Sequence, residues 1–296
     1  MKFTLYNDIK SFYGDTYNVL LHHEAQNLIP LGNIIIGYEG KDKTEWRDPA
    51  AWFMAAVSDK NGILLTAVMT PPFNVTLYAT DNIISEEALS CLIQGIGETD
   101  FSVPGVMAEK SLAECFAKTY AALKGTSYSI RMSQRIYELT SVNPEIPLKG
   151  NLRLADERDM SFLPYWIENF YSDCFFENHT VKNETEHYLH LIKKEKFHVL
   201  ECDNTPVSMA QINREMQTVC GVSAVYTPPY FRAKGYATSC VAKLSLLILE
   251  RGFAKCVLYT DLANPTSNSI YQKIGYTPLC DSVEIRFAPQ VESEKN

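Results

Sequence analysis

A strand–turn–helix pattern in the C-terminal half of the chain has the residue types needed to bind a phosphate group. Residues 225–231 are mostly apolar and contain two prolines, and Arg-Ala-Lys-Gly-Tyr-Ala follows at positions 232–237, just before a long apolar helix. A helix that begins this abruptly leaves its first backbone N–H groups unpaired and points the positive end of its dipole at one place. The pattern therefore favours a ligand that carries a pyrophosphate.

Small side chains in this turn would let a ligand approach the backbone. Gly235 and Ala237 offer little or no obstruction, and Gly235 can adopt a positive φ without steric cost. Arg232 can add charge-assisted hydrogen bonds to a phosphate, or it can form a surface ion pair with a carboxylate; residue types alone do not choose between the two. Lys234 is expected to be solvated.

A second pattern follows about twenty residues later. Residues 257–260 are predicted to form a buried strand, and Asn264, a short helix, Tyr271 and the pair Gly275-Tyr276 come after it. Asn264 and Tyr271 are separated by two helical turns and so share one helix face. Together, the Arg-x-x-Gly-x-Ala turn and this second pattern resemble the two signatures of the GCN5-related N-acetyltransferase (GNAT) superfamily.

The chain as a whole is similar to a two-domain GNAT branch in which a degenerate copy precedes the working one. We predict a degenerate GNAT-like domain at 1–145 and an acetyl-CoA-binding catalytic domain at 146–296, with a linker at 141–150. The repeat is suggested by Thr70-Pro71-Pro72-Phe73, which echoes Thr227-Pro228-Pro229-Tyr230. The expected fold class is α/β of the α+β type. Each domain would have a mixed, largely antiparallel, twisted sheet flanked by helices, with a splayed-strand acetyl-CoA cleft in the C-terminal one.

The resemblance implies how the cosubstrate acetyl-CoA would be held. The backbone of a splayed strand would bond pantetheine as if it were another strand, and the amides of residues 233–238 would hold the pyrophosphate. Asn264 would steady the cofactor arm. The implied binding residues are Val225, Tyr226, Thr227, Arg232, Ala233, Lys234, Gly235, Tyr236, Ala237, Thr238, Asn264 and Ser267. The N-terminal half lacks such a turn and is not expected to hold coenzyme A.

The resemblance also implies direct attack of an amine on the thioester, through a ternary complex without a covalent enzyme intermediate. Tyr271 matches the position of the general acid, because a phenol with a pKa of about 10 stays protonated at neutral pH. The alternative is that Tyr271 is one packing residue among 17 tyrosines. No acidic residue lies in 219–227, so the general base is open. The positional candidates are Glu201, Asp261, Glu177 and His179, and we favour a water relay.

Other reactive groupings are weaker. His187 and His190 can share a helix face, but no third metal ligand is evident, and the adjacent His22 and His23 are expected to point apart. The eight cysteines form no Cys-x-x-Cys pair and are predicted to be reduced and buried. No metal is expected.

Composition bounds the remaining choices. The chain has 296 residues, 46% of them hydrophobic and 21% charged, which suits a globular protein with two cores. A formal net charge of −8 argues against a nucleic-acid partner. No membrane-spanning run or signal-peptide pattern is evident, so a cytoplasmic location is expected.

The predicted function is transfer of an acetyl group from acetyl-CoA to a primary amine of a small molecule or a protein. Two other readings stay open: a non-catalytic acetyl-CoA sensor or scaffold, and a plain interaction module. The identity of the acceptor and the oligomeric state cannot be derived from these residues, because acceptor pockets are built from variable helices and loops.

Overall fold

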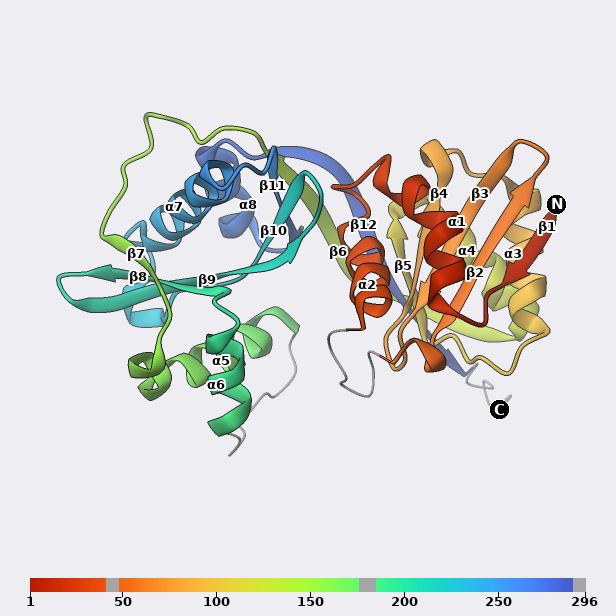
Figure 1. Ribbon diagram of the computed structural model, residues 1–296, viewed down its shortest axis with the longest axis horizontal. Helices are drawn as coiled ribbons and strands as arrows, with labels where there is room; N and C mark the ends of the chain where they lie inside the picture. The colour runs from red at the N-terminus through yellow and green to blue at the C-terminus, as the bar shows by residue number, and fades with distance from the viewer. Residues whose placement is uncertain (41–47, 176–184, 290–296) are drawn as a thin grey trace, which may run out of the picture. The chain divides into compact units, whose positions relative to one another are not determined.

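The computed structural model describes residues 1–40, 48–175 and 185–289, which form two compact units (Figure 1). The first contains residues 1–135 and 280–296, and the second contains residues 136–279. Unit 1 has strands β1 (Lys2–Leu5), β2 (Phe53–Asp59), β3 (Gly62–Met69), β4 (Val75–Ala79) and β5 (Gly105–Glu109), and helices α1 (Ile9–Leu21), α2 (Leu28–Glu39), α3 (Glu86–Gly97) and α4 (Lys110–Lys124). Unit 2 has strands β7 (Asn151–Leu154), β8 (Phe197–Cys202), β9 (Thr205–Glu215), β10 (Val219–Tyr226) and β11 (Lys255–Asp261), and helices α5 (Leu163–Phe175), α6 (Thr185–Lys193), α7 (Tyr236–Glu250) and α8 (Pro265–Ile274).

Two long strands belong partly to each unit. β6 (Thr126–Leu139) is in unit 1 up to Arg135, and β12 (Thr277–Pro289) is in unit 1 from Cys280 onward. The compact units therefore differ from a single division of the chain after residue 145, because the last strand returns to the sheet of the first unit and pairs with β5. Which residues make up each functional domain stays a prediction.

The sheet of unit 1 has the order β1-β2-β3-β4-β5-β12-β6 and is antiparallel at β1–β2, β2–β3, β3–β4 and β5–β12. β4 and β5 pair in parallel. Alternate residues of β2, such as Phe53 and Ala55, pack with α3 and α4 in the main core. Helices α1 and α2 contact β2 and β4 and lie over the sheet in Figure 1.

Unit 2 repeats this layering. Its strands have the order β6-β11-β10-β9-β8-β7, with antiparallel β7–β8, β8–β9 and β9–β10 pairs and a parallel β10–β11 pair. Helices α7 and α8 bury one face of the sheet, and α5 and α6 bury the other, as Figure 1 shows. The expected fold class is confirmed: two α/β units with mixed, largely antiparallel sheets.

Several local predictions are confirmed and others are wrong. The β2–β3 hairpin turns at Lys60-Asn61-Gly62, where the Asp59 carboxylate accepts hydrogen bonds from the N–H groups of Asn61 and Gly62. The sequence also predicts a helix at 112–123 that begins with a capping box of Ser111 and Glu114. That cap is wrong: α4 begins two residues earlier, and Glu109 accepts from the N–H groups of Ser111 and Leu112. The carboxylate thus replaces the hydroxyl as the cap.

The two Thr-Pro-Pro-aromatic tetrapeptides occupy different places in their units. Residues 70–73 lie in the β3–β4 turn, whereas residues 227–230 lie between β10 and α7. In unit 1, the counterpart of β10 is β4, because each lies between an antiparallel and a parallel neighbour. The similarity of these two tetrapeptides is therefore not evidence of a repeat, because they lie in turns that do not correspond. The correspondence between the units rests on strand order.

His198 links the pH of the solution to the stability of unit 2. Its side chain is 1% exposed on β8, its Nδ1–H donates to the carbonyl of Lys196 at 3.2 Å, and its Nε2 atom is buried without a partner in the described part of the chain. Burial lowers the pKa of His198 to about 4. The folded protein therefore keeps this imidazole neutral at pH values where the unfolded chain protonates it.

Because the folded pKa is lowered, the stabilisation is complete above the unfolded value of about 6.5 and is lost as the pH falls toward 4. We expect the free energy of unfolding to lose about 3 kcal/mol from this group over that interval. Urea unfolding of His198→Asn at pH 7 and pH 4.5 should show a smaller loss than the wild type. The exposed His190→Asn is the control. An unchanged pH slope in His198→Asn would contradict the prediction.

No helix within the described ranges is long and apolar enough to cross a membrane.

Candidate active site

Strands β10 and β11 separate partway along their length. They pair only through Val219↔Lys255, Cys220↔Cys256 and Gly221↔Val257, although β10 continues to Tyr226 and β11 to Asp261. On its other side, β10 stays paired with β9 but shifts register between Ser223 and Tyr226, where Ala224 has a positive φ of 47°. This bulge increases local twist and bends the strand. The predicted splayed strand is thus present in unit 2.

The turn after β10 has the backbone geometry of an anion site. A single 3-10 turn, η5 (Pro229–Phe231), leads to Ala233 at φ 60° and Gly235 at φ 79°, and Gly235 caps α7 without a side-chain hydrogen bond. Within the described residues, the N–H groups of residues 233–238 have no hydrogen-bond acceptor, whereas Ser239 N–H donates to the carbonyl of Gly235. We call residues 232–238 the cradle.

The cradle is open to a ligand. A Cβ atom placed on Gly235 would have no heavy atom within 4 Å, and the first turn of α7 carries no acidic residue. Unpaired N–H groups at a helix start, with no competing carboxylate on that helix, favour negative charge. The geometry of the cradle therefore favours an anionic ligand such as a phosphate group.

Lys149 adds positive charge beside the cradle. Its Nζ atom donates to the carbonyl of Lys234 at 2.8 Å and lies 5.8 Å from the ring centre of Tyr236, while its backbone N–H donates to Ser239 Oγ at 3.0 Å. Lys149 lies in the predicted linker at 141–150, and its position beside the cradle was not predicted. No local pattern indicated it, because the contact joins residues 85 positions apart.

The charged residues of the turn itself are engaged with the protein. Arg232 donates from Nε to the carbonyl of Thr227 at 2.9 Å and from a terminal nitrogen to the carboxylate of Asp173 on α5 at 2.7 Å. Of the two alternatives for Arg232, this conformation has the ion pair. Both side chains are about half exposed, so the pair is weak and a phosphate can compete for the guanidinium. Lys234 lies 4.7 Å from the ring centre of Tyr230.

Two carbonyls in the backbone segment expected to bind pantetheine, residues 225–227, already have partners. The carbonyl of Tyr226 accepts from Ser208 Oγ at 3.0 Å, and that of Thr227 accepts from Arg232. Any strand-like bonding by a ligand therefore depends on the other backbone groups of residues 225–227.

Tyr271 lies on α8 and is 7% exposed, within the core that α7 and α8 share with the sheet. Its ring is 5.9 Å from that of Tyr276 and 6.3 Å from that of Tyr137, measured between ring centres. Burial raises the pKa of Tyr271. The phenol is therefore protonated at neutral pH. Its hydroxyl has no hydrogen-bond partner among the described residues, so this proton is available for donation.

The second motif is built around a cap. Asn264 is the N-cap of α8, and its Oδ1 accepts from the N–H of Ser267 at 3.0 Å. Asn268, which sequence reasoning missed, joins three elements: its amide donates to the carbonyls of Asp261 and Asn264, and its oxygen accepts from the hydroxyl of Tyr137 at 3.1 Å. The side-chain oxygen of Asn264 is thus used by the helix, while Asn268 fixes the end of β11.

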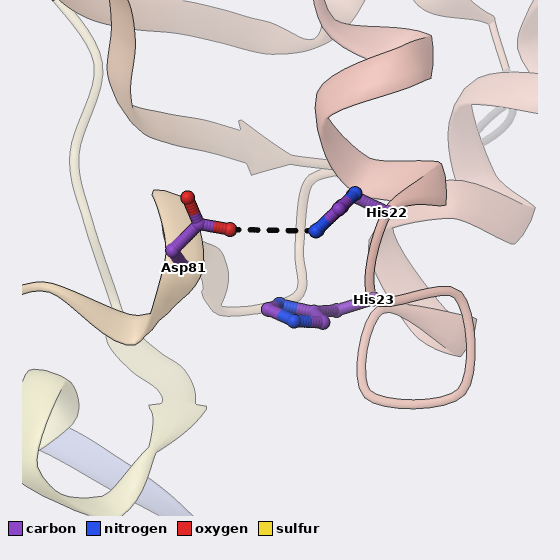
Figure 2. A group of neighbouring side chains, drawn as sticks. All are labelled: His22, His23 and Asp81. Atoms are coloured by element: carbon purple, nitrogen blue, oxygen red, sulfur yellow. Dashed lines mark ion pairs between the residues drawn. The ribbon is translucent and has the colours of Figure 1, made fainter.

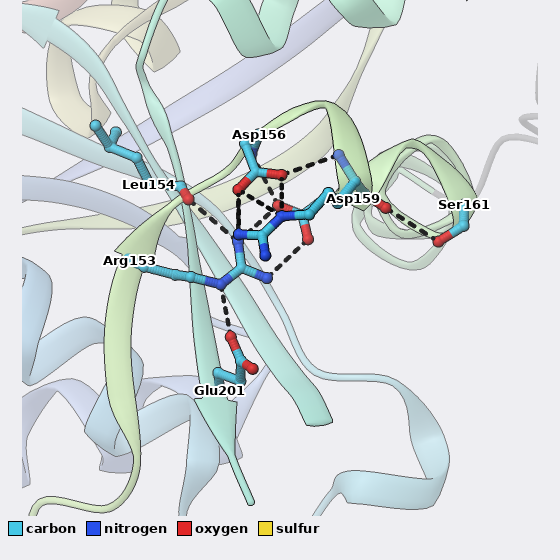
Figure 3. Close-up of polar contacts among 7 residues, drawn as sticks. Arg153, Leu154, Asp156, Asp159, Ser161 and Glu201 are labelled. Atoms are coloured by element: carbon cyan, nitrogen blue, oxygen red, sulfur yellow. Dashed lines mark hydrogen bonds and ion pairs between the residues drawn. The ribbon is translucent and has the colours of Figure 1, made fainter. Parts of the chain in front are cut away.

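Of the four positional candidates for a general base, the structure describes Glu201 and Asp261. Glu201 pairs with Arg153 at 2.6 Å, and the same guanidinium makes two 2.8 Å bonds to the buried Asp159 (Figure 3). Asp261 accepts from the N–H of Ala263 at 2.8 Å. Glu177 and His179 lie outside the described residues. Glu201 is therefore committed to an ion-pair network that ties η4 (Glu157–Ser161) to β7 and β8.

The comparisons with known proteins agree with this geometry. Residues 165–276 match the model of the Acetyltransferase (GNAT) family. No curated protein matches the chain. Among solved structures, the chain is similar to a GNAT-family acetyltransferase from Colwellia psychrerythraea, with 11% identity, a TM-score of 0.60 and coverage of 97% of this chain and 99% of that one.

Two further structures are similar over almost the full length. A GCN5-related N-acetyltransferase from Sphaerobacter thermophilus has 11% identity, a TM-score of 0.63 and coverage of 96% and 95%. A tandem GNAT protein from the clavulanic acid biosynthesis pathway has 10% identity, a TM-score of 0.56 and coverage of 99% of each chain. Identities this low establish fold alone. The chain therefore carries a GNAT acetyltransferase domain at residues 165–276 and, as a whole, has the fold of two-domain GNAT proteins.

Proposed function

We propose that this protein is an N-acetyltransferase that transfers the acetyl group of acetyl-CoA to a primary amine through a ternary complex. The observation that carries the proposal is a strand separated from its parallel neighbour after Gly221 that leads directly to the unpaired N–H groups of the cradle. Strand-edge backbone and a helix N-terminus in succession suit a ligand with an amide-bearing arm and a pyrophosphate.

When bound, acetyl-CoA supplies a thioester carbonyl that the nitrogen of an amine attacks as the carbon–sulfur bond breaks. The cradle holds the pyrophosphate and so fixes where the carbonyl lies. A backbone N–H on the separated part of β10 stabilises the developing oxyanion. Tyr271 donates its proton to the departing sulfur. Water accepts the two protons that the acceptor ammonium loses, one before its nitrogen attacks and one after the new carbon–nitrogen bond has formed.

Unit 1 has a different helix start at the corresponding position. Ser85 caps α3 by accepting from the N–H of Ala88, and Glu86 and Glu87 lie in the first turn. A side-chain cap removes a donor and two carboxylates repel a phosphate. These residues support the expectation that coenzyme A binds to unit 2 alone.

The proposal is tested by calorimetry with acetyl-CoA, followed by an assay of thiol release over amine classes that include polyamines, aminoglycosides, amino acids and peptide N-termini. We expect saturable binding and thiol release stimulated by at least one class. Binding with slow thiol release that no amine stimulates would favour a non-catalytic sensor or scaffold. A lack of binding would favour a plain interaction module. The net charge of −8 supports the absence of a nucleic-acid partner. A cytoplasmic location also remains part of the proposal.

Lys149 should contribute to cosubstrate affinity. Replacing it with Met keeps the aliphatic stem but removes the charge next to the cradle, so we expect the Kd for acetyl-CoA to rise about tenfold, the value of one charge-assisted hydrogen bond. The wild-type affinity should also fall more steeply with salt than that of Lys149→Met. Calorimetry at two salt concentrations measures both effects.

Lys273→Met, on the exposed side of α8, is the matched control and should leave the affinity unchanged. Dephospho-coenzyme A, which lacks the 3′-phosphate, distinguishes which phosphate Lys149 contacts. If Lys149→Met lowers the affinity for this ligand and for acetyl-CoA by the same factor, Lys149 contacts the pyrophosphate. Equal affinities for Lys149→Met and the wild type would refute this role.

A further inference from the structure

The sequence predicted that the adjacent His22 and His23 point apart, and this prediction is wrong. Their ring centres are 5.0 Å apart, and one ligand atom from each histidine and one from Asp81 all lie within 4.8 Å of one another (Figure 2). The expectation assumed that both residues lay within a helix. α1 ends at Leu21 with His22 as its C-cap, and His23 lies in the turn that follows.

A buried phenol holds two of these three residues. The hydroxyl of Tyr78, on β4, is 2.7 Å from Nδ1 of His23, and it accepts from the backbone N–H of Asp81 at 3.3 Å. Tyr78 is 1% exposed, so its position is set by the core of unit 1. Asp81 follows β4 in a short 3-10 turn, η3 (Thr80–Asn82), with a positive φ of 55°. Its carboxylate is 3.6 Å from Nε2 of His22.

A second brace joins the two segments that carry the cluster. The side-chain amides of Gln26 and Asn82 exchange hydrogen bonds of 2.7 and 3.2 Å. One amide follows the histidines and the other follows Asp81, so the pair keeps both segments in register. The convergence of the three side chains therefore depends on packing and on neutral hydrogen bonds as well as on their own charges.

We propose that His22, His23 and Asp81 form a Zn²⁺ site. Two imidazoles and one carboxylate are ligands that zinc takes in tetrahedral sites, with water completing the coordination. In the tautomer with Nδ1 protonated, His23 donates to Tyr78 and keeps Nε2 for the ion; an outer partner of this kind orients a ligating histidine. The side chains of His22 and Asp81 are 70% and 57% exposed, so an ion can reach them.

The cluster in unit 1 occupies a position that corresponds to the cradle of unit 2. β4 in unit 1 corresponds to β10 in unit 2, and each is followed by a 3-10 turn and a helix. The cluster thus stands where unit 2 has its cradle, and it offers cation ligands in place of anion donors. An exposed ion pair between His22 and Asp81 would be weak, and it would not involve His23.

The test uses full-length protein without an affinity tag, stripped with EDTA and dialysed. Calorimetry with ZnCl₂ should give one site per chain, and Co²⁺ should give visible absorption without a thiolate charge-transfer band. His22→Ala, His23→Ala and Asp81→Asn should each weaken binding by more than tenfold. Tyr78→Phe, which keeps the ring but removes the outer partner, should weaken it by about tenfold.

The control is His187→Ala/His190→Ala, which removes two exposed histidines from α6 and should bind zinc like the wild type. Zinc should also raise the Tm of the wild type but not that of Asp81→Asn, an exposed substitution compatible with folding. The absence of saturable heat, a thiolate band, or affinity that survives all three ligand substitutions would overturn the site. Acetyl-CoA binding, measured in parallel, is independent of these outcomes.

Discussion

Gly235→Glu should abolish binding of acetyl-CoA, while Gly252→Glu should leave it intact. Gly235 starts α7 and Gly252 follows its end; both have a positive φ, and a Cβ atom on either would meet no heavy atom within 4 Å. The two substitutions therefore impose a similar backbone strain of about 1–2 kcal/mol. They differ in where the new carboxylate lies, because only the one introduced at position 235 would enter the cradle and repel a pyrophosphate.

Calorimetry with acetyl-CoA measures the difference directly, and thermal unfolding of both variants checks that the folding cost is matched. We expect an affinity loss of at least about 100-fold for Gly235→Glu alone, as expected for a buried like-charge contact. A Gly235→Ala variant separates charge from strain, since it adds the Cβ atom without the carboxylate. Undiminished affinity in Gly235→Glu would show that the cradle does not hold the pyrophosphate, and the proposed function would lose its main support.

Tyr271→Phe should lower kcat by about 10²- to 10⁴-fold with little change in the Kd for acetyl-CoA, because it removes one proton donor and no packing volume. The raised pKa of Tyr271 keeps the donor protonated over the whole neutral range. Since its hydroxyl has no partner among the described residues, the substitution should cost little stability.

Tyr276→Phe is the matched control for this experiment. Its ring is a neighbour of Tyr271 in the same core, but its hydroxyl is bonded to Ser245 Oγ at 2.8 Å. We expect Tyr276→Phe to lower the free energy of unfolding by about 1 kcal/mol and to leave kcat nearly unchanged. If Tyr271→Phe weakened turnover and affinity equally, Tyr271 would be a binding residue rather than the general acid.

The features that sequence predicted well are those whose physical cause is local. The cradle follows from a strand, two prolines and a glycine that needs a positive φ, all within about a dozen residues. The splay could be inferred only through resemblance, since pairing that stops at Gly221 depends on β9 and β11 as well as on β10.

The residues that sequence missed act across long separations. Lys149 reaches the cradle from a segment with linker composition, Asp173 takes up Arg232 from another helix, and Asn268 binds Tyr137 on β6. Each contact depends on the tertiary fold and has no periodicity along the chain. The general base stays unassigned for the same reason, since its identity depends on which groups the acceptor meets.

Local errors arose where two side chains compete for one role or where an element ends early. Glu109 rather than Ser111 caps α4, because its carboxylate lies two positions earlier and accepts from the N–H groups of Ser111 and Leu112. The sequence also predicts one helix around residues 15–28. The structure instead has the end of α1 and the approach to α2 there, and the first turn of α2 accommodates Pro30. His22 and His23 fall in the gap between them, which is why a helix-based argument misplaced both rings.

The return of β12 has a consequence for biosynthesis. Unit 1 draws residues 280–289 into its sheet beside β5, so the first unit begun at the ribosome is among the last to be finished. Until those residues emerge, β5 offers an unpaired edge, and the nascent chain must avoid aggregating through it while residues 136–279 of unit 2 are made. Gene fragments cut between the two units would separate that strand from its partners, so the halves are better studied together than apart.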